Sequence, residues 1–262
     1  MSKAPTVIAI TGASSGIGAA VAQYYAAPGR TLALIGRHVE RLEQVARACR
    51  DKGATVEKGT ADVRDRDAIG EWLLSFDARN PIDLLLANAG MLTGSLKDGS
   101  IESLDQSTVQ IETNFIGALN TALPVLERMI ERKRGQIAFT SSLAAFQSHP
   151  DWPAYCASKA GLLVYATSLR ERMRGTGVRI NTICPGWVTA PINDPFIMWR
   201  PMEMRPEVAA RVIARGLARD REVIAFPQPL AFSSRRITPL LPRMFHRLGY
   251  KLFKAKHRPQ TG

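Results

Sequence analysis

Cysteine is scarce in this chain of 262 residues, which contains only three. Cys49, Cys156 and Cys184 are an odd number, and they form neither a CxxC pair nor any other metal-ligand spacing. This pattern argues against a disulfide framework and against a metal site, and it is typical of reduced thiols in a reducing compartment. We therefore expect buried cysteines, no bound metal and a cytoplasmic location.

A long hydrophobic run is also absent. The longest nearly apolar stretch, residues 82–92, is interrupted by Asp83 and Asn88, and it is shorter than the roughly 18 residues that suggest a membrane-spanning helix. The apolar residues 7–10 are too few for the hydrophobic region of a signal peptide, so we interpret them as a strand. We expect neither a spanning helix nor a secretory leader.

Acidic residues are missing from the C-terminal end, because none follows Glu222. The formal net charge of the chain is +12, and residues 235–262 contain eight Lys and Arg, which leaves +4 for residues 1–234. Any attraction to a polyanion therefore belongs to this basic tail.

The basic tail has the pattern of an amphipathic helix. Apolar residues recur at helical spacing with basic residues between them: Leu241, Phe245, Leu248 and Leu252, with Arg243, Arg247, Lys251 and Lys254. Because helices on anionic membrane surfaces have this pattern, we predict peripheral membrane contact through residues 235–256. Docking of the tail on its own domain or on a partner subunit is the alternative, and it is the commoner fate of such a segment. We predict no nucleic-acid binding, since a recognition motif is lacking.

Short strand-like runs alternate with longer amphipathic stretches along the chain. The runs cover residues 6–11, 31–35, 55–57, 82–87, 136–141 and 178–184. Strands that are apolar on both faces and separated by helices indicate a mainly parallel sheet covered on both sides. The sequence therefore predicts a doubly wound α/β sheet of the Rossmann type. Without repeats or low-complexity linkers, residues 1–262 are expected to form one domain.

A glycine-rich turn follows the first predicted strand and opens a helical pattern over residues 19–25. Glycine permits a tight turn and a close approach of backbone N–H groups to phosphate, and serine hydroxyls can donate further hydrogen bonds. A turn between a strand and a helix is where the pyrophosphate of a dinucleotide binds. The candidate cofactor residues here are Gly12, Ser14, Ser15, Gly16, Ile17 and Gly18.

The second predicted strand is followed by Arg37, which bears on the choice of cofactor. An acidic residue at this point binds the ribose 2′-hydroxyl of NAD, whereas a basic residue accepts the 2′-phosphate of NADP. The guanidinium group has the fork of donors that suits phosphate, so we predict NADP(H) in preference to NAD(H). Further candidate cofactor contacts follow the third and fourth strands: Asp62, Val63, Asn88, Ala89 and Gly90.

Tyr155 and Lys159 lie four residues apart in a helical pattern, so both side chains point to one face. A nearby ammonium group stabilises phenolate and lowers the pKa of tyrosine from about 10, which improves its match to proton transfer near neutral pH. Tyr250 and Lys254 repeat the spacing, but they lie in the tail with no predicted strand beside them. We therefore choose Tyr155 and Lys159 as the catalytic pair.

Six motifs together resemble the short-chain dehydrogenase/reductase family in both order and spacing. They are TGASSGIG (11–18), ANAG (87–90), Asn114, TSS (140–142), YCASK (155–159) and PGWV (185–188). The resemblance covers roughly residues 5–190, and six motifs in sequence are far more specific than any one. It implies hydride transfer between a nicotinamide cofactor and a carbonyl/alcohol pair.

By this resemblance, Tyr155 is the general acid/base, and Lys159 lowers its pKa and binds the nicotinamide ribose. Ser142 hydrogen-bonds the reacting oxygen, and Asn114 holds a water in a proton relay. The resemblance also implies a homodimer or homotetramer. Finally, it implies cofactor contacts near the PGWV motif, from Pro185, Gly186, Val188 and Thr189.

One departure from the family pattern lies just after this motif. The family usually has PG-x-V-x-T, whose threonine contacts the nicotinamide carboxamide or a phosphate. Here Ala190 takes that position and Thr189 precedes it. We expect Thr189 to substitute.

The segment after residue 190 is expected to close the substrate pocket. Its apolar residues predict a small apolar carbonyl or alcohol substrate, although core packing would explain them nearly as well: Ile192, Phe196, Ile197, Met198, Trp199, Met202 and Met204. The single domain then divides into a dinucleotide-binding and catalytic core (1–190), a lid with the last helix and strand (191–225) and a basic extension (226–262).

The sequence thus predicts an NADP(H)-dependent enzyme that reduces an apolar ketone. Alcohol oxidation and use of NAD(H) are the near alternatives. A more distant one is an NADP(H)-binding sensor or peripheral membrane scaffold without turnover, because a fold can be retained without its chemistry. The complete set of four predicted catalytic residues favours an enzyme.

Overall fold

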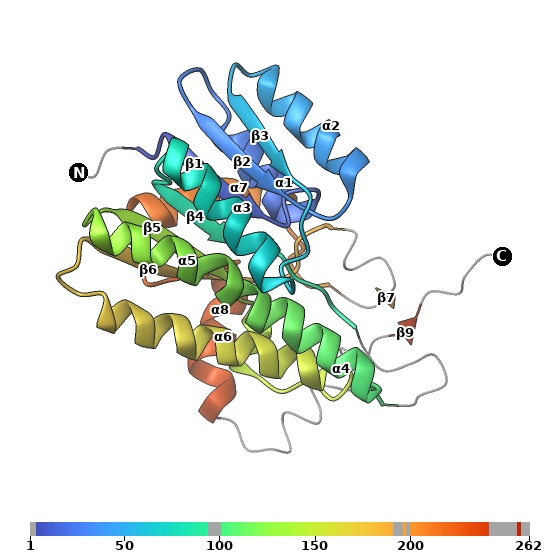
Figure 1. Ribbon diagram of the computed structural model, residues 1–262. Helices are drawn as coiled ribbons and strands as arrows, with labels where there is room; N and C mark the ends of the chain where they lie inside the picture. Colours follow the sequence, from blue (N-terminus) through green and yellow to red (C-terminus); the bar gives the residue numbers. More distant parts are fainter. Residues whose placement is uncertain (1–3, 94–100, 191–195, 198–199, 241–255, 258–262) are drawn as a thin grey trace.

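Seven parallel strands form the central sheet of the computed structural model, which describes residues 4–93, 101–190, 196–197, 200–240 and 256–257. Their order in the sheet is β3-β2-β1-β4-β5-β6-β8, and Figure 1 labels β1 to β6. The strands are β1 (Val7–Thr11), β2 (Thr31–Ile35), β3 (Thr55–Gly59), β4 (Leu84–Ala87), β5 (Gly135–Thr140), β6 (Val178–Pro185) and β8 (Val223–Phe226). The order reverses between β1 and β4, where open α/β sheets bind their ligands. The predicted doubly wound sheet is confirmed.

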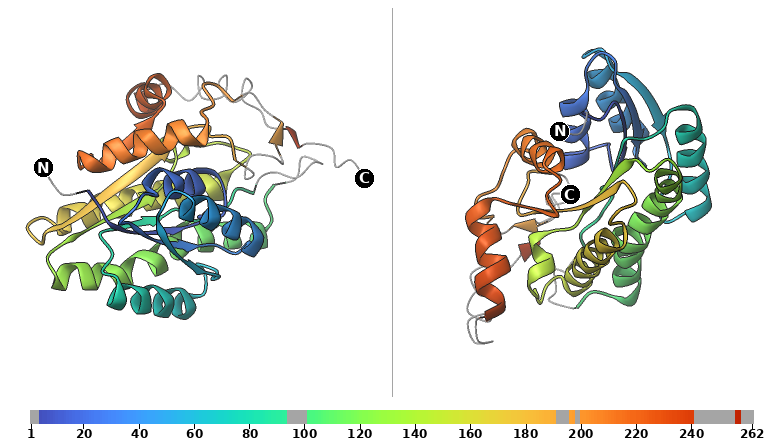
Figure 2. Two further views of the ribbon diagram at one scale, coloured as in Figure 1. Left: turned by 90° about the horizontal axis from the view of Figure 1, so that it is seen from above. Right: turned by 90° about the vertical axis from the view of Figure 1, so that its left-hand side faces the viewer.

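Helices cover both faces of this sheet, as Figure 2 shows. One face packs against α1 (Gly16–Tyr25), α2 (Val39–Arg50) and α7 (Pro206–Ala218). The other packs against α3 (Arg66–Arg79), α5 (Gly117–Glu131) and α6 (Pro153–Arg172). A shorter helix, α4 (Leu104–Ile111), continues through a π-helical turn, η1 (Glu112–Ile116), into α5.

Each buried strand contributes apolar side chains to both cores, one on each face of the sheet. Within β1, Ile8 and Ile10 pack into the core beneath α1, whereas Ala9 between them faces the opposite core. Leu32 and Leu34 of β2 alternate with Ala33 in the same way. Successive side chains of a strand point to opposite faces, so both layers of helices are held by the same strands.

The first residues of the C-terminal part of the chain pack against the rest of the domain. After β8 come α8 (Gln228–Phe232) and two short turns, η4 (Ser233–Ile237) and η5 (Thr238–Leu240). Ala231 packs with Leu143, Cys184 and Ala225 in a small third cluster. The predicted amphipathic helix over residues 241–252 lies outside the described residues. A two-residue pair, β7 (Phe196–Ile197) with β9 (Lys256–His257), is antiparallel.

All three cysteines are buried and free, as expected. In the parts of the chain that the structure describes, no helix has the length and hydrophobicity needed to cross a membrane.

Candidate active site

The carboxyl ends of β1 and β4 are joined by hydrogen bonds at the point where the strand order reverses. The backbone N–H of Asn88 donates to Oγ1 of Thr11 at 3.1 Å. The side-chain amide of Asn88 donates to the carbonyl oxygens of Thr11 at 3.2 Å and of Gly12 at 3.5 Å. Asn88 therefore holds the start of the glycine-rich turn in place from the neighbouring strand.

The glycine-rich turn is packed too tightly for any other residue at two positions. Gly12 has a φ of +67°, and a Cβ there would lie 2.8 Å from Cα of Ala89. A Cβ on Gly18 would overlap the carbonyl oxygen of Gly12. Within the described residues, the Ser15 side chain makes no capping bond to α1. The N-terminus of α1 therefore presents donors that suit a pyrophosphate.

Two guanidinium groups converge on Asp62 at the carboxyl ends of β2 and β3. Arg64 contacts Asp62 at 2.7 Å, and Arg37 lies 3.6 Å from the same carboxylate oxygen. Hydrogen bonding from Arg64 holds the pKa of Asp62 below its usual value. The Arg37 side chain is 51% exposed and so remains open to a ligand. Sequence reasoning missed Arg64, although it lies only two residues after Asp62.

Ser142 and Tyr155 meet at the end of β5. Strand β5 ends at Thr140, and Ser142 lies two residues later. Its Oγ accepts a hydrogen bond from the backbone N–H of Ala144 at 3.1 Å. Burial raises the pKa of Tyr155 to about 12, and a hydrogen bond with Ser142 opposes that rise only in part. The phenol is therefore protonated at neutral pH.

Lys159 lies one helical turn beyond Tyr155 and is almost fully buried. Its Nζ donates to the carbonyl oxygen of Thr140 at 2.9 Å and lies 5.8 Å from the centroid of the Tyr155 ring. Burial lowers the pKa of Lys159 to about 8. The expected lowering of the pKa of Tyr155 by this ammonium group is not what the structure has, because loss of solvent on burial dominates the pKa of both groups.

Asn114 lies in the π-helical turn η1 and is completely buried. Its Oδ1 accepts from the backbone N–H of Met91 at 2.8 Å, and its Nδ2 donates to the Met91 carbonyl at 2.9 Å and to Oγ of Ser158 at 3.2 Å. A Cβ on Gly90 would lie 3.1 Å from Oδ1 of Asn114 and 3.3 Å from Nζ of Lys159. All four predicted catalytic side chains thus gather around the ends of β4 and β5.

The family model for short chain dehydrogenases matches residues 6–200. The chain belongs to this family. Its members are oxidoreductases that use a nicotinamide dinucleotide, and the glycine-rich turn with its open helix N-terminus fits the pyrophosphate of that cofactor.

Three similar proteins extend this result. An uncharacterized oxidoreductase of Myxococcus xanthus is 35% identical over 234 residues, which cover 89% of this chain and 91% of the relative. A fatty acyl-CoA reductase of Acinetobacter baylyi is 31% identical over 257 residues, 95% of this chain and 85% of the relative. The fold matches the bulky-bulky ketone specific alcohol dehydrogenase of Comamonas testosteroni with a TM-score of 0.75, 22% identity and coverage of 94% and 93%.

In this short-chain dehydrogenase, position 190 faces the glycine-rich turn as in the family pattern, and Thr189 does not take its place. A Cβ on Gly16 would lie 3.0 Å from Cβ of Ala190, so Ala190 is the residue that faces the glycine-rich turn. Thr189 is exposed, and its backbone N–H bonds to the Met204 carbonyl at 3.0 Å. The structure does not bring the Thr189 side chain to the turn, and its cofactor contact stays a prediction.

The predicted lid residues of this short-chain dehydrogenase are only partly described. Met202 is 50% exposed, whereas Met204 packs against the core beneath α1 and α7. The other predicted lining residues lie outside the described residues or have undescribed side chains. Sequence reasoning missed an aromatic cluster near the site: His149 stacks on Trp152 with ring centroids 4.0 Å apart, and Trp187 meets Trp152 edge-on at 6.0 Å.

Proposed function

We propose that this short-chain dehydrogenase reduces apolar carbonyl compounds with NADPH. The observation that carries the proposal is the hydrogen bond between Ser142 and the buried phenol of Tyr155 at the end of β5, at the same edge of the parallel sheet as the glycine-rich turn after β1. A phenol with a pKa of about 12 is a proton donor at neutral pH. Carbonyl reduction requires a proton for the substrate oxygen, and the protonated phenol is placed to supply it.

In this mechanism, bound NADPH supplies the hydride. The Ser142 hydroxyl donates a hydrogen bond to the carbonyl oxygen of the substrate, and Tyr155 donates its proton to the same oxygen as negative charge develops there. The Lys159 ammonium stabilises the phenolate that remains, because burial strengthens the attraction between opposite charges. Asn114 keeps Met91 and Ser158 in place around these groups.

The preference for NADPH is supported by the two guanidinium groups beside Asp62. Arg37 and Arg64 both lie where the adenosine ribose of a Rossmann-bound dinucleotide is placed. A 2′-phosphate would receive donors from both and replace the carboxylate as their counter-charge. NAD(H) has no phosphate at this point and would leave Arg37 paired only with Asp62.

An apolar substrate is supported by the aromatic cluster. Trp152 lies three residues before Tyr155, and Trp187 lies two residues after Pro185, the carbonyl of which is 3.5 Å from Oγ of Ser142. Aromatic walls with few polar groups are typical of pockets for apolar ligands. The name of the Acinetobacter baylyi relative, a fatty acyl-CoA reductase, points to a carbonyl on a long aliphatic chain.

The decisive experiment follows NADPH oxidation by absorbance with aldehydes, ketones and acyl thioesters of increasing chain length, and repeats each assay with NADH. We expect turnover with NADPH that rises with chain length and disappears in Tyr155→Phe. Binding of NADPH without turnover of any compound would instead favour the sensor or scaffold alternative. Faster turnover with NADH would contradict the role assigned to Arg37.

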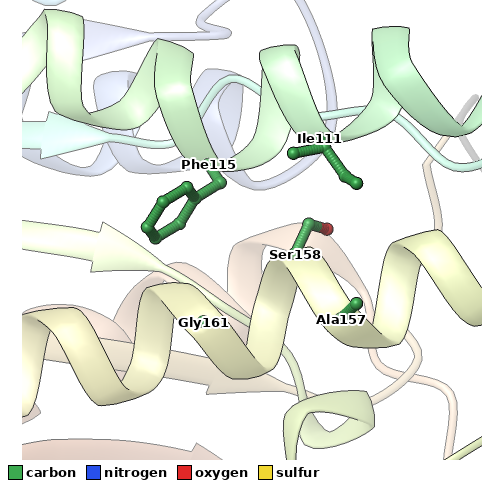
Figure 3. A pocket seen from close by; sticks show the side chains of 5 residues that line it. All are labelled: Ile111, Phe115, Ala157, Ser158 and Gly161. Atoms are coloured by element: carbon green, nitrogen blue, oxygen red, sulfur yellow. The ribbon is translucent and has the colours of Figure 1, made fainter.

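We also propose that the protein is a homo-oligomer that pairs through α4, η1 and α6. An apolar pocket lies between these helices, lined by Ile111, Phe115, Ala157, Ser158 and Gly161 (Figure 3). Nearby apolar side chains are exposed, with Ile116 at 43% and Val164 at 66%. Exposed apolar patches of this kind mark protein–protein contacts. In sedimentation analysis, Val164→Glu should shift the protein to the monomer; an unchanged mass would reject this surface.

We further propose that the peripheral membrane contact predicted for residues 235–256 begins three residues earlier, at Phe232. Phe232 is 62% exposed and Leu240 is 83% exposed, with the exposed Arg235 and Arg236 between them. Apolar and basic side chains on one segment suit an anionic lipid surface. Vesicles with phosphatidylglycerol should co-sediment the protein, and Phe232→Ala with Leu240→Ala should weaken this. Ile101→Ala, at an 83% exposed residue elsewhere, is the matched control.

A further inference from the structure

A buried carboxylate outside the family motifs joins three segments beside the active site. Glu102 is 8% exposed. Its Oε2 accepts a hydrogen bond from the backbone N–H of Ala154 at 3.1 Å. Its Oε1 accepts from Oγ1 of Thr93 at 3.2 Å and from Nε2 of Gln110 at 3.1 Å. One side chain thus connects the chain after β4, helix α4 and the first turn of α6.

The contact with Ala154 acts directly on the catalytic helix. Helix α6 begins at Pro153, and Ala154 is the residue before Tyr155. The first N–H groups of a helix have no partner within the helix, and a carboxylate at this end also interacts favourably with the helix dipole. Glu102 therefore fixes the first turn of α6, from which the Tyr155 phenol projects.

Gln110 binds Glu102 and also the segment after β4 that Asn114 holds. The two amide side chains lie one helical turn apart, and both bind the chain that leaves β4. Oε1 of Gln110 accepts from the backbone N–H of Thr93 at 2.6 Å, in the way that Asn114 accepts from Met91. The segment from Met91 to Thr93 is therefore clamped twice from one side, and Glu102 extends the clamp to α6.

A buried carboxylate is a costly way to fill space. Its desolvation costs several kcal/mol unless hydrogen bonds replace the lost water, and an apolar side chain would pack without that cost. Glu102 regains its partners only when Thr93, Gln110 and Ala154 are all in place. It therefore favours one arrangement of these three segments over neighbouring ones.

We propose that Glu102 is a positioning residue that holds the Tyr155 phenol against Ser142 and the substrate oxygen. Its bond to the Ala154 N–H holds the first turn of α6, and its bond to Gln110 holds α4 and the segment after β4. The inference rests on the proposed function of Tyr155 as the proton donor. Misplacement of a catalytic group by about 1 Å costs on the order of a hundredfold in rate.

The first test replaces the carboxylate and separates rate from binding. Glu102→Ala should lower kcat by about ten- to a hundredfold, while the dissociation constant for NADPH, measured by fluorescence, changes less than about twofold. The control is Glu127→Ala on the exposed face of α5, which should leave both quantities unchanged. If the folded Glu102→Ala enzyme keeps its kcat and loses only thermal stability, or loses NADPH binding to the same extent as kcat, the positioning role is wrong.

Exchanging the side chains of Glu102 and Gln110 should restore kcat, which would not happen if Glu102→Gln only disturbed packing. Glu102→Gln alone places an amide N–H₂ against Thr93 and Gln110, so kcat should fall. Glu102→Gln combined with Gln110→Glu restores the bonds to Ala154, to the Thr93 N–H and between the two side chains. The new amide accepts from Ala154 and donates to the new carboxylate and to Oγ1 of Thr93, which becomes an acceptor, and the carboxylate accepts from the Thr93 N–H. The double variant should recover kcat to within about threefold of the unsubstituted enzyme. No recovery would overturn the proposal.

A readout without turnover separates this inference from the proposed function. With fluorotyrosine incorporated, the fluorine resonance of Tyr155 is assigned by its loss in Tyr155→Phe. It should move in Glu102→Ala, stay in place in Glu127→Ala and return in the exchanged double variant. A resonance that stays in place in Glu102→Ala would overturn the positioning role even if no substrate were turned over. Movement of the resonance without turnover of any carbonyl compound would reject only the proposed function.

Discussion

The Nζ atom of Lys159 lies 5.8 Å from the centroid of the Tyr155 ring, and both side chains are held in the interior beside the end of β5. Burial lowers the pKa of the lysine to about 8 and raises that of the tyrosine to about 12. Each group is thereby shifted toward its neutral form. At neutral pH the tyrosine is protonated and the lysine is still charged, so the charge of Lys159 is retained at a cost in stability.

Removal of that buried charge should stabilise the protein in a pH-dependent way. The pKa of Lys159 is about 8 in the folded state and 10.5 in the reference state, so the unfolded chain binds more protons between these values. Stability contributed by this group therefore rises as pH rises from 8 to 10.5, and the penalty is complete below pH 8. After allowance for the lost bond to Thr140, Lys159→Met should stabilise the cofactor-free protein by about 2 kcal/mol at pH 7.

Chemical denaturation across a pH series measures this effect. The difference between Lys159→Met and the unsubstituted protein should shrink toward zero as the pH approaches 10. Lys52→Met, at an exposed lysine, should show no such trend. A difference that is independent of pH would mean that packing, not charge, is responsible.

Loss of the phenol should abolish proton donation without disturbing the cofactor site. Tyr155→Phe is expected to lower kcat by about 10²- to 10⁴-fold, the usual contribution of a general acid. NADPH affinity should change less than about twofold, since the ring itself is kept. Tyr24→Phe, at a 45% exposed tyrosine, is the matched control for kcat. Steady-state kinetics and equilibrium binding of NADPH together check both parts.

The two guanidinium groups at Asp62 should determine cofactor choice. Arg37→Ala should raise the KM for NADPH about tenfold, because one charge-assisted hydrogen bond to the 2′-phosphate is worth roughly 1.5 kcal/mol. The KM for NADH should stay the same or fall. Arg64→Ala should act in the same direction, and Arg47→Ala on the exposed side of α2 should have no effect. Equal changes for the two cofactors would contradict phosphate recognition.

Two helical glycines should respond in opposite ways to alanine. A Cβ on Gly18 would overlap the Gly12 carbonyl and lie 2.7 Å from Nδ2 of Asn88, so Gly18→Ala should displace the glycine-rich turn and abolish NADPH binding. A Cβ on Gly70 in α3 would have its nearest neighbour at 3.7 Å, in Pro124. Gly70→Ala should therefore stabilise the protein by about 0.5–1 kcal/mol. Calorimetry and binding titrations distinguish the two outcomes.

The sequence predicted those parts of the protein that depend on local pattern. Six of the seven strands of the main sheet are close to the predicted ranges, because each is a short apolar run bounded by turns. The gathering of Ser142, Tyr155, Lys159 and Asn114 followed from motif order and from the rule that parallel strands end at one edge. The strand β8 was expected only as part of the longer segment 191–225, and its last residue, Phe226, falls in the expected basic extension.

The parts that sequence reasoning missed depend on packing between distant segments. Glu102 and Ala154 are 52 residues apart, and nothing near Glu102 in the chain marks its carboxylate as buried. The pKa of Tyr155 was expected to fall because the lysine was visible in the sequence, whereas the desolvation that raises it was not. The positions of Ala190 and Thr189 depend on which side of an extended chain faces Gly16, and a one-residue shift reverses that choice.

The π-helical turn η1 makes the site sensitive to chain length as well as to residue type. Such a turn has one residue more than the α-helical path between the same ends. Deletion of the exposed Ile116 would let α4 and α5 join as a regular helix with both ends in place, so only the residues of the turn itself would rewind about the helix axis. Asn114 lies within this turn and would rotate away from Met91 and Ser158, although no residue assigned to catalysis had been removed. The variant would thus have a more regular helix and a lower activity. The irregular turn is therefore needed for activity and not for the stability of the helix.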